Sequence, residues 1–274
     1  MNDVCKSHTA IKNNDIKRCK WCSSNLEYVK YHDNEWGVPN FCDDYLLEML
    51  ILESFQAGLS WECVLNKRNS FREAYDSFNL DKICLYDDKK IDELLSNKNI
   101  IRNRLKVVAS INNAKVFKKI KEEFGSFYNY LKTFTNGIVT YETGVTSSEL
   151  SDKISIDLRK RQMKFVGTTI IYSYLQAIGV IYSHDEECFM YMDKELLLSN
   201  VFKIHTTEKK AKRIRNNLQV SFDIVEFCKE KILDLDNACY IYKKGKNYYC
   251  EVDDIIITIN SYSYTIITAC KKKL

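Results

Sequence analysis

The sequence predicts a mainly helical domain followed by a small α+β module that contains an antiparallel meander. Helical apolar patterns fill the chain to about residue 189, and short runs of Ile, Tyr, Val and Thr fill its end. Glycine and proline are scarce, with 8 and 1 among 274 residues, which argues against a turn-rich sandwich or barrel. We therefore expect a polar extension over 1–16, a helical domain over 17–189 and the α+β module over 190–274.

The helical patterns are clearest near the start of the domain. Four apolar side chains between Leu46 and Phe55 share one helical face, which predicts an amphipathic helix over 43–56. Asp43 is the expected N-cap, and Gly58 lies just past the end. Further helical patterns cover 70–78, 90–97, 103–124, 126–134, 147–162 and 167–181. Short connections between such patterns are typical of an all-helical domain.

The last third of the chain has a different pattern. Two helical stretches lie near 207–217 and 222–233. Four runs rich in Ile, Tyr, Val and Thr then follow, at 239–242, 248–252, 255–260 and 264–270. The segment Lys244-Gly245-Lys246 separates the first two runs, as the turn of a β-hairpin would.

Composition excludes several functions. The net charge of +4 comes from the end of the chain, because residues 1–189 carry 26 basic and 26 acidic groups and residues 190–274 carry 15 and 11.

No two glycines are closer than seven residues, so neither common glycine-rich phosphate loop is present. No segment reaches the ~18 apolar residues of a membrane span, and the polar start has no apolar signal region. We expect a cytoplasmic protein whose 11 cysteines are reduced.

Four Cys and His residues form a candidate metal set: Cys19, His32, His184 and Cys188. The last two are four residues apart, which places both on one face of a helical turn. Two Cys and two His are a tetrahedral zinc set. Spacing alone leaves Cys22 and Cys42 as rival ligands, and it also leaves open that all these thiols are packed in the core.

Aromatic residues gather around the first part of this set, where the three tryptophans of the chain lie within forty-one residues. The rings are those of Trp21, Tyr28, Tyr31, Trp36 and Trp61. Glu53 lies between them in the sequence. Rings stack on flat ligands and attract cations, and a carboxylate accepts N–H bonds, so the group suits a flat cationic or amino-bearing ligand. The alternative is that the rings are core and Glu53 is a capping group.

A basic run covers residues 98–121, which carry eight basic side chains and no acid. Arg102, Arg104 and Lys106 lie in its first half. A helix–turn–helix hairpin whose positive turn faces phosphates would explain the run. A solvated helix face is the alternative.

Several strings resemble 3-methyladenine DNA glycosylase I. They are CKW (Cys19–Trp21), YHDNEWGVP (Tyr31–Pro39), QAGLSW (Gln56–Trp61) and KFVGTT (Lys164–Thr169), followed by His184-x-x-x-Cys188. The resemblance covers roughly residues 17–189 and implies a helix-hairpin-helix DNA glycosylase fold. It also implies a monomeric repair enzyme that flips 3-methyladenine out of double-stranded alkylated DNA. Hydrolysis of the N-glycosidic bond would leave an abasic site and free 3-methyladenine.

The same resemblance assigns the candidate residues. Cys19, His32, His184 and Cys188 would bind one structural zinc ion. Glu53 would contact the extruded base and Trp61 would stack on it, while Tyr28, Tyr31, Trp21 and Trp36 would line or support the pocket. Because a methylated base is a cation that leaves easily, no strong catalytic base is expected, and Glu53 is assigned to recognition and electrostatics.

DNA contacts are implied at two turns. Gly58 and Leu59 would fill the gap left in the duplex, and the hairpin with Arg102, Arg104 and Lys106 would bind the DNA backbone. The hairpin departs from the family, which usually has glycine at the positions of Asn99 and Leu105. Asn adopts a left-handed backbone readily and Leu does not, so we expect a looser grip on phosphate. Phe55 replaces a polar residue usual beside the pocket, which predicts altered groove contacts.

The tail resembles a small bacterial domain family of unknown function, through the strings HTTEKKAKRIRNNL, KKGKNYY and TINSYSYTIITA. Its basic residues are Lys209, Lys210, Lys212, Arg213 and Arg215. They either extend the DNA footprint or form a solvated helix face. Two alternative functions remain open at this point: a zinc-stabilised module that binds lesions without releasing a base, and a glycosylase for another alkylated base such as 3-methylguanine.

Overall fold

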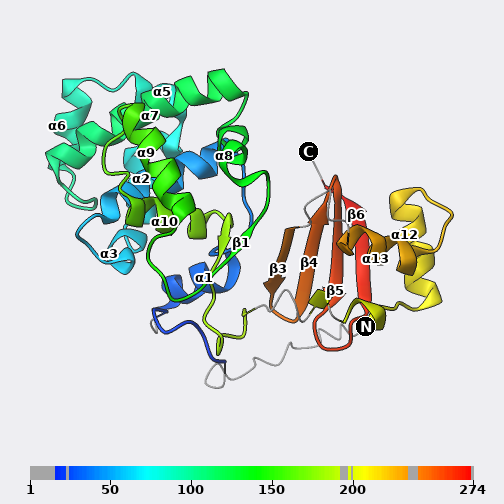
Figure 1. Cartoon of the computed structure of the whole chain (residues 1–274). Coiled ribbons are helices and arrows are strands. Elements are labelled where there is room, and N and C mark those ends of the chain that lie inside the picture. The colour runs from blue at the N-terminus through cyan, green and yellow to red at the C-terminus, as the bar shows by residue number, and fades with distance from the viewer. Residues whose placement is uncertain (1–15, 23–24, 192–196, 199, 234–239, 273–274) are drawn as a thin grey trace, which may run out of the picture.

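The computed structural model describes residues 16–22, 25–191, 197–198, 200–233 and 240–272. Figure 1 shows a helical part, which runs from α1 to α10, beside a smaller module built on a four-stranded sheet. The mainly α prediction with a C-terminal antiparallel sheet is confirmed. The predicted extension up to residue 15, the chain at 192–196 and the predicted strand start at Cys239 lie outside the described residues.

The helical part follows the predicted order. Its helices are α1 (Leu26–Asn34), α2 (Asp43–Gln56), α3 (Trp61–Leu65), α4 (Arg68–Ala74), the 3-10 helix η2 (Asp76–Phe78), α5 (Leu80–Cys84), α6 (Asp88–Ser96), α7 (Arg104–Phe124), α8 (Phe127–Thr135), α9 (Glu149–Lys160) and α10 (Thr168–Ala177). Both ends of the predicted 43–56 helix agree with α2, but its N-cap is Cys42 and not Asp43. The sequence patterns missed α1, α3 and α5.

Two predicted helices are shorter than expected because the backbone turns left-handed. The 70–78 pattern breaks after Ala74, where Asp76, Ser77 and Phe78 all have positive φ. The 167–181 pattern ends at Ala177, and Gly179 follows with φ +77°. A Cβ on Gly179 would lie 2.4 Å from the backbone N of Pro39, so only glycine lets these two segments pack this closely.

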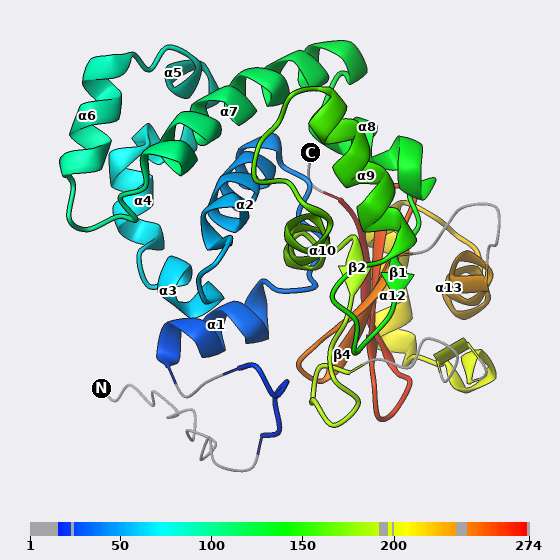
Figure 2. The ribbon, with the colours of Figure 1, turned by 60° about the vertical axis from the view of Figure 1, so that its left-hand side comes forward.

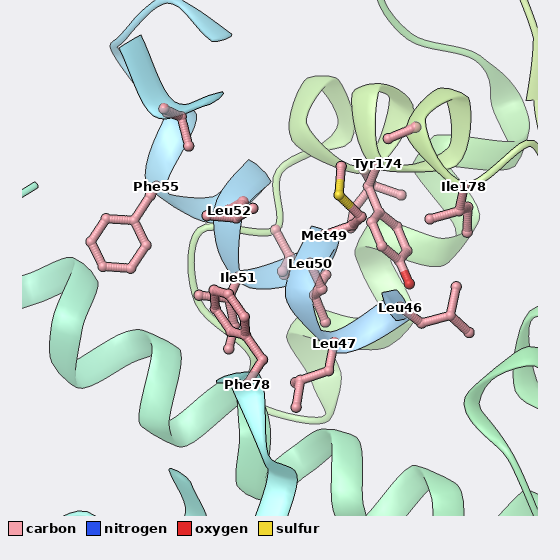
Figure 3. Packing of buried hydrophobic residues seen from close by; sticks show 14 of the residues in the cluster. Leu46, Leu47, Met49, Leu50, Ile51, Leu52, Phe55, Phe78, Tyr174 and Ile178 are labelled. Atoms are coloured by element: carbon pink, nitrogen blue, oxygen red, sulfur yellow. The ribbon is translucent and has the colours of Figure 1, made fainter. Parts of the chain in front are cut away.

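Helix α2 lies at the centre of the helical core. The sequence predicted an amphipathic helix, but α2 has no exposed face along most of its length. Every residue from Leu46 to Phe55 is buried. Figure 3 shows Leu46 and Met49 close to Tyr174 and Ile178 of the α10 region, while Ile51 faces Phe78 on another side. Apolar Met49, Ile51 and Leu52 widen the predicted stripe around the helix, so α2 is surrounded by other elements.

The second part contains its own hydrophobic core between two helices and the sheet. Its elements are η3 (Val201–Lys203), α12 (Glu208–Leu218), α13 (Ile224–Leu233), β3 (Tyr240–Lys244), β4 (Asn247–Val252), β5 (Ile255–Asn260) and β6 (Ile266–Lys271). The strands pair antiparallel in the order β3-β4-β5-β6, which confirms the meander. Alternate residues of β4 are buried, as expected for a sheet with one face on a core.

The edge strand β3 is joined to the helical part through two tyrosines. A short parallel ladder pairs β1 (Thr140–Tyr141) with β2 (Ile181–Tyr182). The hydroxyl of Tyr141 donates to the carbonyl of Ile241 and accepts from its N–H, and the hydroxyl of Tyr182 accepts from the N–H of Lys243 at 3.3 Å. The helical part thereby covers a sheet edge that would otherwise be open to pairing. No helix among the described residues is long and apolar enough to cross a membrane.

Candidate functional site

A pocket of about 380 Å³ opens between α1, the end of α2, the start of α3 and α10. Its lining residues are Trp21, Tyr28, Tyr31, Trp36, Glu53, Gln56, Trp61, Gly144, Val145, Thr146, Ser173, Gln176, Ser183 and Asp185. All five aromatic residues singled out in the sequence therefore meet Glu53 in one cavity. In Figure 2, α1 and α3 lie beside the end of α2, on the same side of the molecule as the connection between α6 and α7.

The rings form an aromatic wall made of two groups in contact: Tyr31 with Trp61, and Trp21 with Trp36 and Tyr28. The centroids of Tyr31 and Trp61 are 5.4 Å apart, and Trp21 lies 4.8 Å from Trp36 and 5.2 Å from Tyr28 in edge contacts. Such offset and edge arrangements are the favoured packing of aromatic side chains. Local structure places Trp61 here, because Ser60 caps α3 by accepting from the N–H of Cys63 at 3.2 Å.

Three polar atoms in this wall lack hydrogen-bond partners among the described residues. Glu53 is 2% exposed, and its Oε2 has no hydrogen-bond partner among the described residues. Burial raises the pKa of Glu53 well above its usual range. Gln56 Oε1 and Trp61 Nε1 are also buried without partners in the described chain. A protein seldom leaves such atoms unpaired, so a flat ligand with N–H donors and an acceptor would complete them.

The four predicted metal ligands also come together. One donor atom each from Cys19, His32, His184 and Cys188 lies within 4.8 Å of the others, and all four residues are buried. Cys19 Sγ is 3.4 Å from His184 Nδ1, and Cys188 Sγ is 3.4 Å from His32 Nε2. A tetrahedral zinc ion with its usual bond lengths separates sulfur and nitrogen ligands by about 3.5 Å. The donor set and its spacing therefore fit zinc.

Protonation and outer contacts agree with this fit. Burial lowers the pKa of His184. The hydrogen bond between the two thiols lowers the pKa of Cys188, joined by those with both histidines, and raises the pKa of Cys19. A neutral imidazole and a thiolate are the ligating forms. His32 Nδ1 is 2.8 Å from Asp33 Oδ1, and Arg18 binds both oxygens of Asp33 at 2.9 and 2.7 Å. A carboxylate behind a histidine is the usual support of a metal ligand.

The rival thiols are not part of this cluster. Among the described residues, the group of metal-ligating atoms contains neither Cys22 nor Cys42. Cys22 is half-buried, and Cys42 is exposed at the start of α2. The cluster adjoins the pocket through Trp36, whose ring centroid is 4.6 Å from that of His184.

The two predicted DNA-binding turns differ in exposure. Gly58 has φ +76° and open space within 4 Å of where a Cβ would lie, and Leu59 is 41% exposed. Arg102, before α7, and Arg104, its first residue, are both exposed. Lys106 is turned inward, because it is 7% exposed and its ammonium donates to the carbonyls of Phe55 and Ala57 at 2.8 and 2.5 Å. It is therefore not presented to phosphate.

The departures from the family have smaller effects than expected. Neither Asn99 nor Leu105 has a left-handed backbone, and Leu105 lies in the first turn of α7 with its side chain in solvent. The expected strain at Leu105 is thus absent. Phe55 is fully buried against Phe71, with ring centroids 4.8 Å apart, so it packs in the core and does not face a groove.

Sequence reasoning missed the polar wall of the pocket, made by Gln56, Ser173, Gln176, Ser183 and Asp185. Two signals were available, since Gln56 begins the QAGLSW string and Asp185 follows His184. On the tail, two of the five predicted basic side chains are engaged within the module: Arg213 donates to the carbonyl of Ile267, and Arg215 pairs with Glu208.

A helical domain whose described residues form an aromatic pocket, a buried unpaired carboxyl group and an adjacent Cys/His cluster is suited to binding a flat heteroaromatic ligand. Comparison with known sequences identifies the family of the chain. The chain belongs to the methyladenine glycosylase family, which it matches over residues 21–191. Residues 198–270 match a second family, DUF3781, of unknown function.

Individual relatives agree with this placement. The chain is 39% identical over 182 residues to DNA-3-methyladenine glycosylase 1 of Escherichia coli K12, which covers 64% of this chain and 97% of that protein. It is 38% identical over 178 residues to DNA-3-methyladenine glycosylase of Haemophilus influenzae, covering 62% and 96%. A crystal structure of 3-methyladenine DNA glycosylase I matches with a TM-score of 0.62 at 38% identity, covering 64% of this chain and 100% of that one. The Staphylococcus aureus enzyme, described as recognising 3-methyladenine, matches with a TM-score of 0.60 at 31% identity, covering 62% and 94%.

Proposed function

We propose that this protein is a DNA repair glycosylase that excises 3-methyladenine from alkylated double-stranded DNA and leaves an abasic site. The observation that carries the proposal is the buried, unpartnered carboxyl group of Glu53 inside the aromatic pocket of the described chain. Family membership and the activities named for the relatives support it. The chain would act as a monomer, and in bacterial cells such as those of the two curated relatives it would lie with the DNA in the cytoplasm.

The proposed mechanism is recognition followed by easy departure. Leu59 and Gly58 fill the gap in the duplex while the flipped base stacks on Trp61 between the rings of the pocket. Glu53 lies beside the base, whose positive charge offsets the unfavourable burial of the carboxylate. Gln56 and Trp61 add one acceptor and one N–H donor. These groups favour a cationic base that already leaves readily, so no strong base is needed to start the reaction.

We also propose that Cys19, His32, His184 and Cys188 bind one structural zinc ion. When bound, the ion would supply a crosslink between the start of the helical part and the segment after β2, with four protein ligands and no open position. This crosslink would hold Trp21 and Trp36 in the pocket wall, because both rings contact the histidines of the cluster.

A release assay tests the function. Purified protein in excess over methylated DNA should liberate free 3-methyladenine and leave alkali-sensitive abasic sites. Lesion binding without any released base would support the alternative, a binding module. Release of 3-methylguanine in preference to 3-methyladenine would instead show a shifted substrate.

Metal analysis tests the zinc site separately. We expect about one zinc per chain, strongly reduced in Cys19→Ser and in His184→Ala. Cys22→Ser is the matched control, since this nearby thiol lies outside the cluster, and it should keep its zinc. Zinc retained by Cys19→Ser but lost by Cys22→Ser would contradict the ligand set.

A further inference from the structure

The pocket contains a second carboxylate, Asp185, which the mechanism above does not use. Asp185 lines the pocket together with Glu53. It also lines an adjoining surface hollow with Arg18, Lys20 and Glu186. Glu53 is fully buried, whereas Asp185 is half-buried. Asp185 therefore lies at the rim, where the base pocket opens toward the surface.

The position of Asp185 is fixed from both sides. Its Oδ2 accepts from the backbone N–H of Lys20 at 2.7 Å, and its own N–H lies 3.3 Å from the sulfur of Cys19. It directly follows His184, a member of the Cys/His cluster. Its other oxygen, Oδ1, has no hydrogen-bond partner in the described part of the chain. A carboxylate held this firmly with one free oxygen is arranged to meet something outside the protein.

The order in which a nucleotide would enter the pocket places its sugar near this residue. A flipped nucleotide goes in base first, so the base reaches the buried Glu53 while the deoxyribose stays at the rim. On this basis, which rests on the proposed function, we propose that Asp185 is a second catalytic residue that faces the deoxyribose of the flipped nucleotide. Glu53 then recognises the base, and Asp185 acts on the sugar.

A negative group at this place would assist the reaction. When the bond between C1′ and the base nitrogen breaks, its electron pair leaves with the base and cancels the positive charge of the methylated ring. The positive charge moves to C1′ and the ring oxygen of the sugar, where the Asp185 carboxylate stabilises it. The oxygen of a water molecule then bonds to C1′, and one water proton passes to solvent, which gives the hydroxyl of the abasic site.

Asp185→Asn tests the proposal, because Asn keeps the shape and the acceptor for the Lys20 N–H while it removes the charge. Single-turnover release of 3-methyladenine should fall about 100-fold. Binding of free 3-methyladenine should stay within about twofold of the wild type, since the base itself meets Glu53. Glu186→Gln is the matched control: it is an acid in the same segment that lines only the outer hollow, and its release rate should be unchanged.

Two further measurements keep the outcome decisive. Zinc content is determined for each variant, and Asp185→Glu, which restores the charge, should recover more activity than Asp185→Asn. Release by Asp185→Asn at the wild-type rate would overturn the role of Asp185 and leave the proposed function intact. A rate loss that follows zinc loss, with no recovery in Asp185→Glu, would also overturn it. A wild-type protein that releases no base would overturn both proposals.

Discussion

Helix α2 carries two buried glutamates five residues apart, and they have opposite surroundings. Glu48 accepts hydrogen bonds from Arg68 at 2.8 Å and from Arg72 at 2.7 and 3.1 Å. Glu53 has a carboxyl oxygen with no partner among the described residues. Burial alone would raise the pKa of Glu48, but its two arginines outweigh that effect and hold the pKa below its usual range, whereas burial raises the pKa of Glu53 unopposed.

Under the proposed function, this difference separates a structural charge from a functional charge within one helix. Glu48 and its arginines form a closed set, to which Glu35 adds a further bond to Arg68 at 2.7 Å, so nothing from outside is needed. Among the described residues, nothing compensates Glu53 in this way. An unpaired buried carboxyl group lowers stability, and such groups are typical of binding and catalytic sites. The contrast can be tested by removing each charge in turn.

The largest effect is expected at Glu48. Glu48→Gln should lower the free energy of unfolding by about 3 kcal/mol, because it breaks a buried ion pair and leaves Arg68 without its main partner. Denaturant unfolding measures this change. Base release should stay near the wild-type rate at temperatures where the variant is folded. Glu187→Gln is the control, as its pair with Lys17 is exposed on both sides, and it should change stability by less than about 0.5 kcal/mol.

Glu53→Gln should show the reverse behaviour. Single-turnover release should fall on the order of 100-fold, since a preorganised charge beside the base is lost. Stability should be unchanged or higher, because the variant no longer buries an ionisable group without a partner. A variant that unfolds more easily yet releases base at the normal rate would show that Glu53, like Glu48, is structural.

The pH dependence of the free energy of unfolding gives a further test of the difference between Glu53 and Glu48. The folded pKa of Glu53 is raised, so above the unfolded pKa of about 4.3 the folded state holds a proton that the unfolded chain has lost, and stability falls as pH rises. Relative to wild type, Glu53→Gln should therefore gain stability as the pH rises above about 4.3. For Glu48 the folded pKa is lowered, so the deficit of Glu48→Gln should be complete at neutral pH and shrink as acid protonates the carboxylate. Unfolding curves from about pH 3 to about pH 8 cover both titrations and decide the point, and parallel slopes for the two variants would contradict it.

The sequence alone could not predict that Glu48 is paired and Glu53 is not, and the reason is physical. Local periodicity predicted both ends of α2, because it depends on near neighbours. Spacing alone left rival thiols open for the candidate metal site, and the family resemblance selected the four residues that the structure brings together. The partners of Glu48 come from α4, twenty and twenty-four residues away. Whether a glutamate is paired depends on how two helices pack, and no local pattern records that.

Lys106 shows the same limit for a cation. In the sequence it belongs to a basic run and was assigned to DNA, but it binds carbonyls forty-nine and fifty-one residues away. The polar wall of the pocket was missed for the same reason, since Ser173, Gln176 and Ser183 gain meaning only when α10 and β2 pack beside α1 and α2. The sequence could name the conspicuous aromatic and metal-ligating residues, and tertiary packing decided which charges remain free.

The smallest expected effect concerns two basic residues, Lys106 and Arg102, which differ in the same way as the two glutamates. Lys106 is paired and Arg102 is exposed without an ionic partner in the described chain. Lys106→Met removes the donor that holds the end of α2 and the start of the Gly58 turn. The DNA concentration needed for half-saturation should therefore rise about 5-fold, and the free energy of unfolding should fall by roughly 1 kcal/mol. The salt dependence of DNA binding by Lys106→Met should equal that of the wild type, because this variant loses no phosphate contact. Arg102→Met should keep full stability but lower the slope of log affinity against log salt by about 1. Equal slopes in the two variants would mean that Lys106 reaches phosphate when DNA binds.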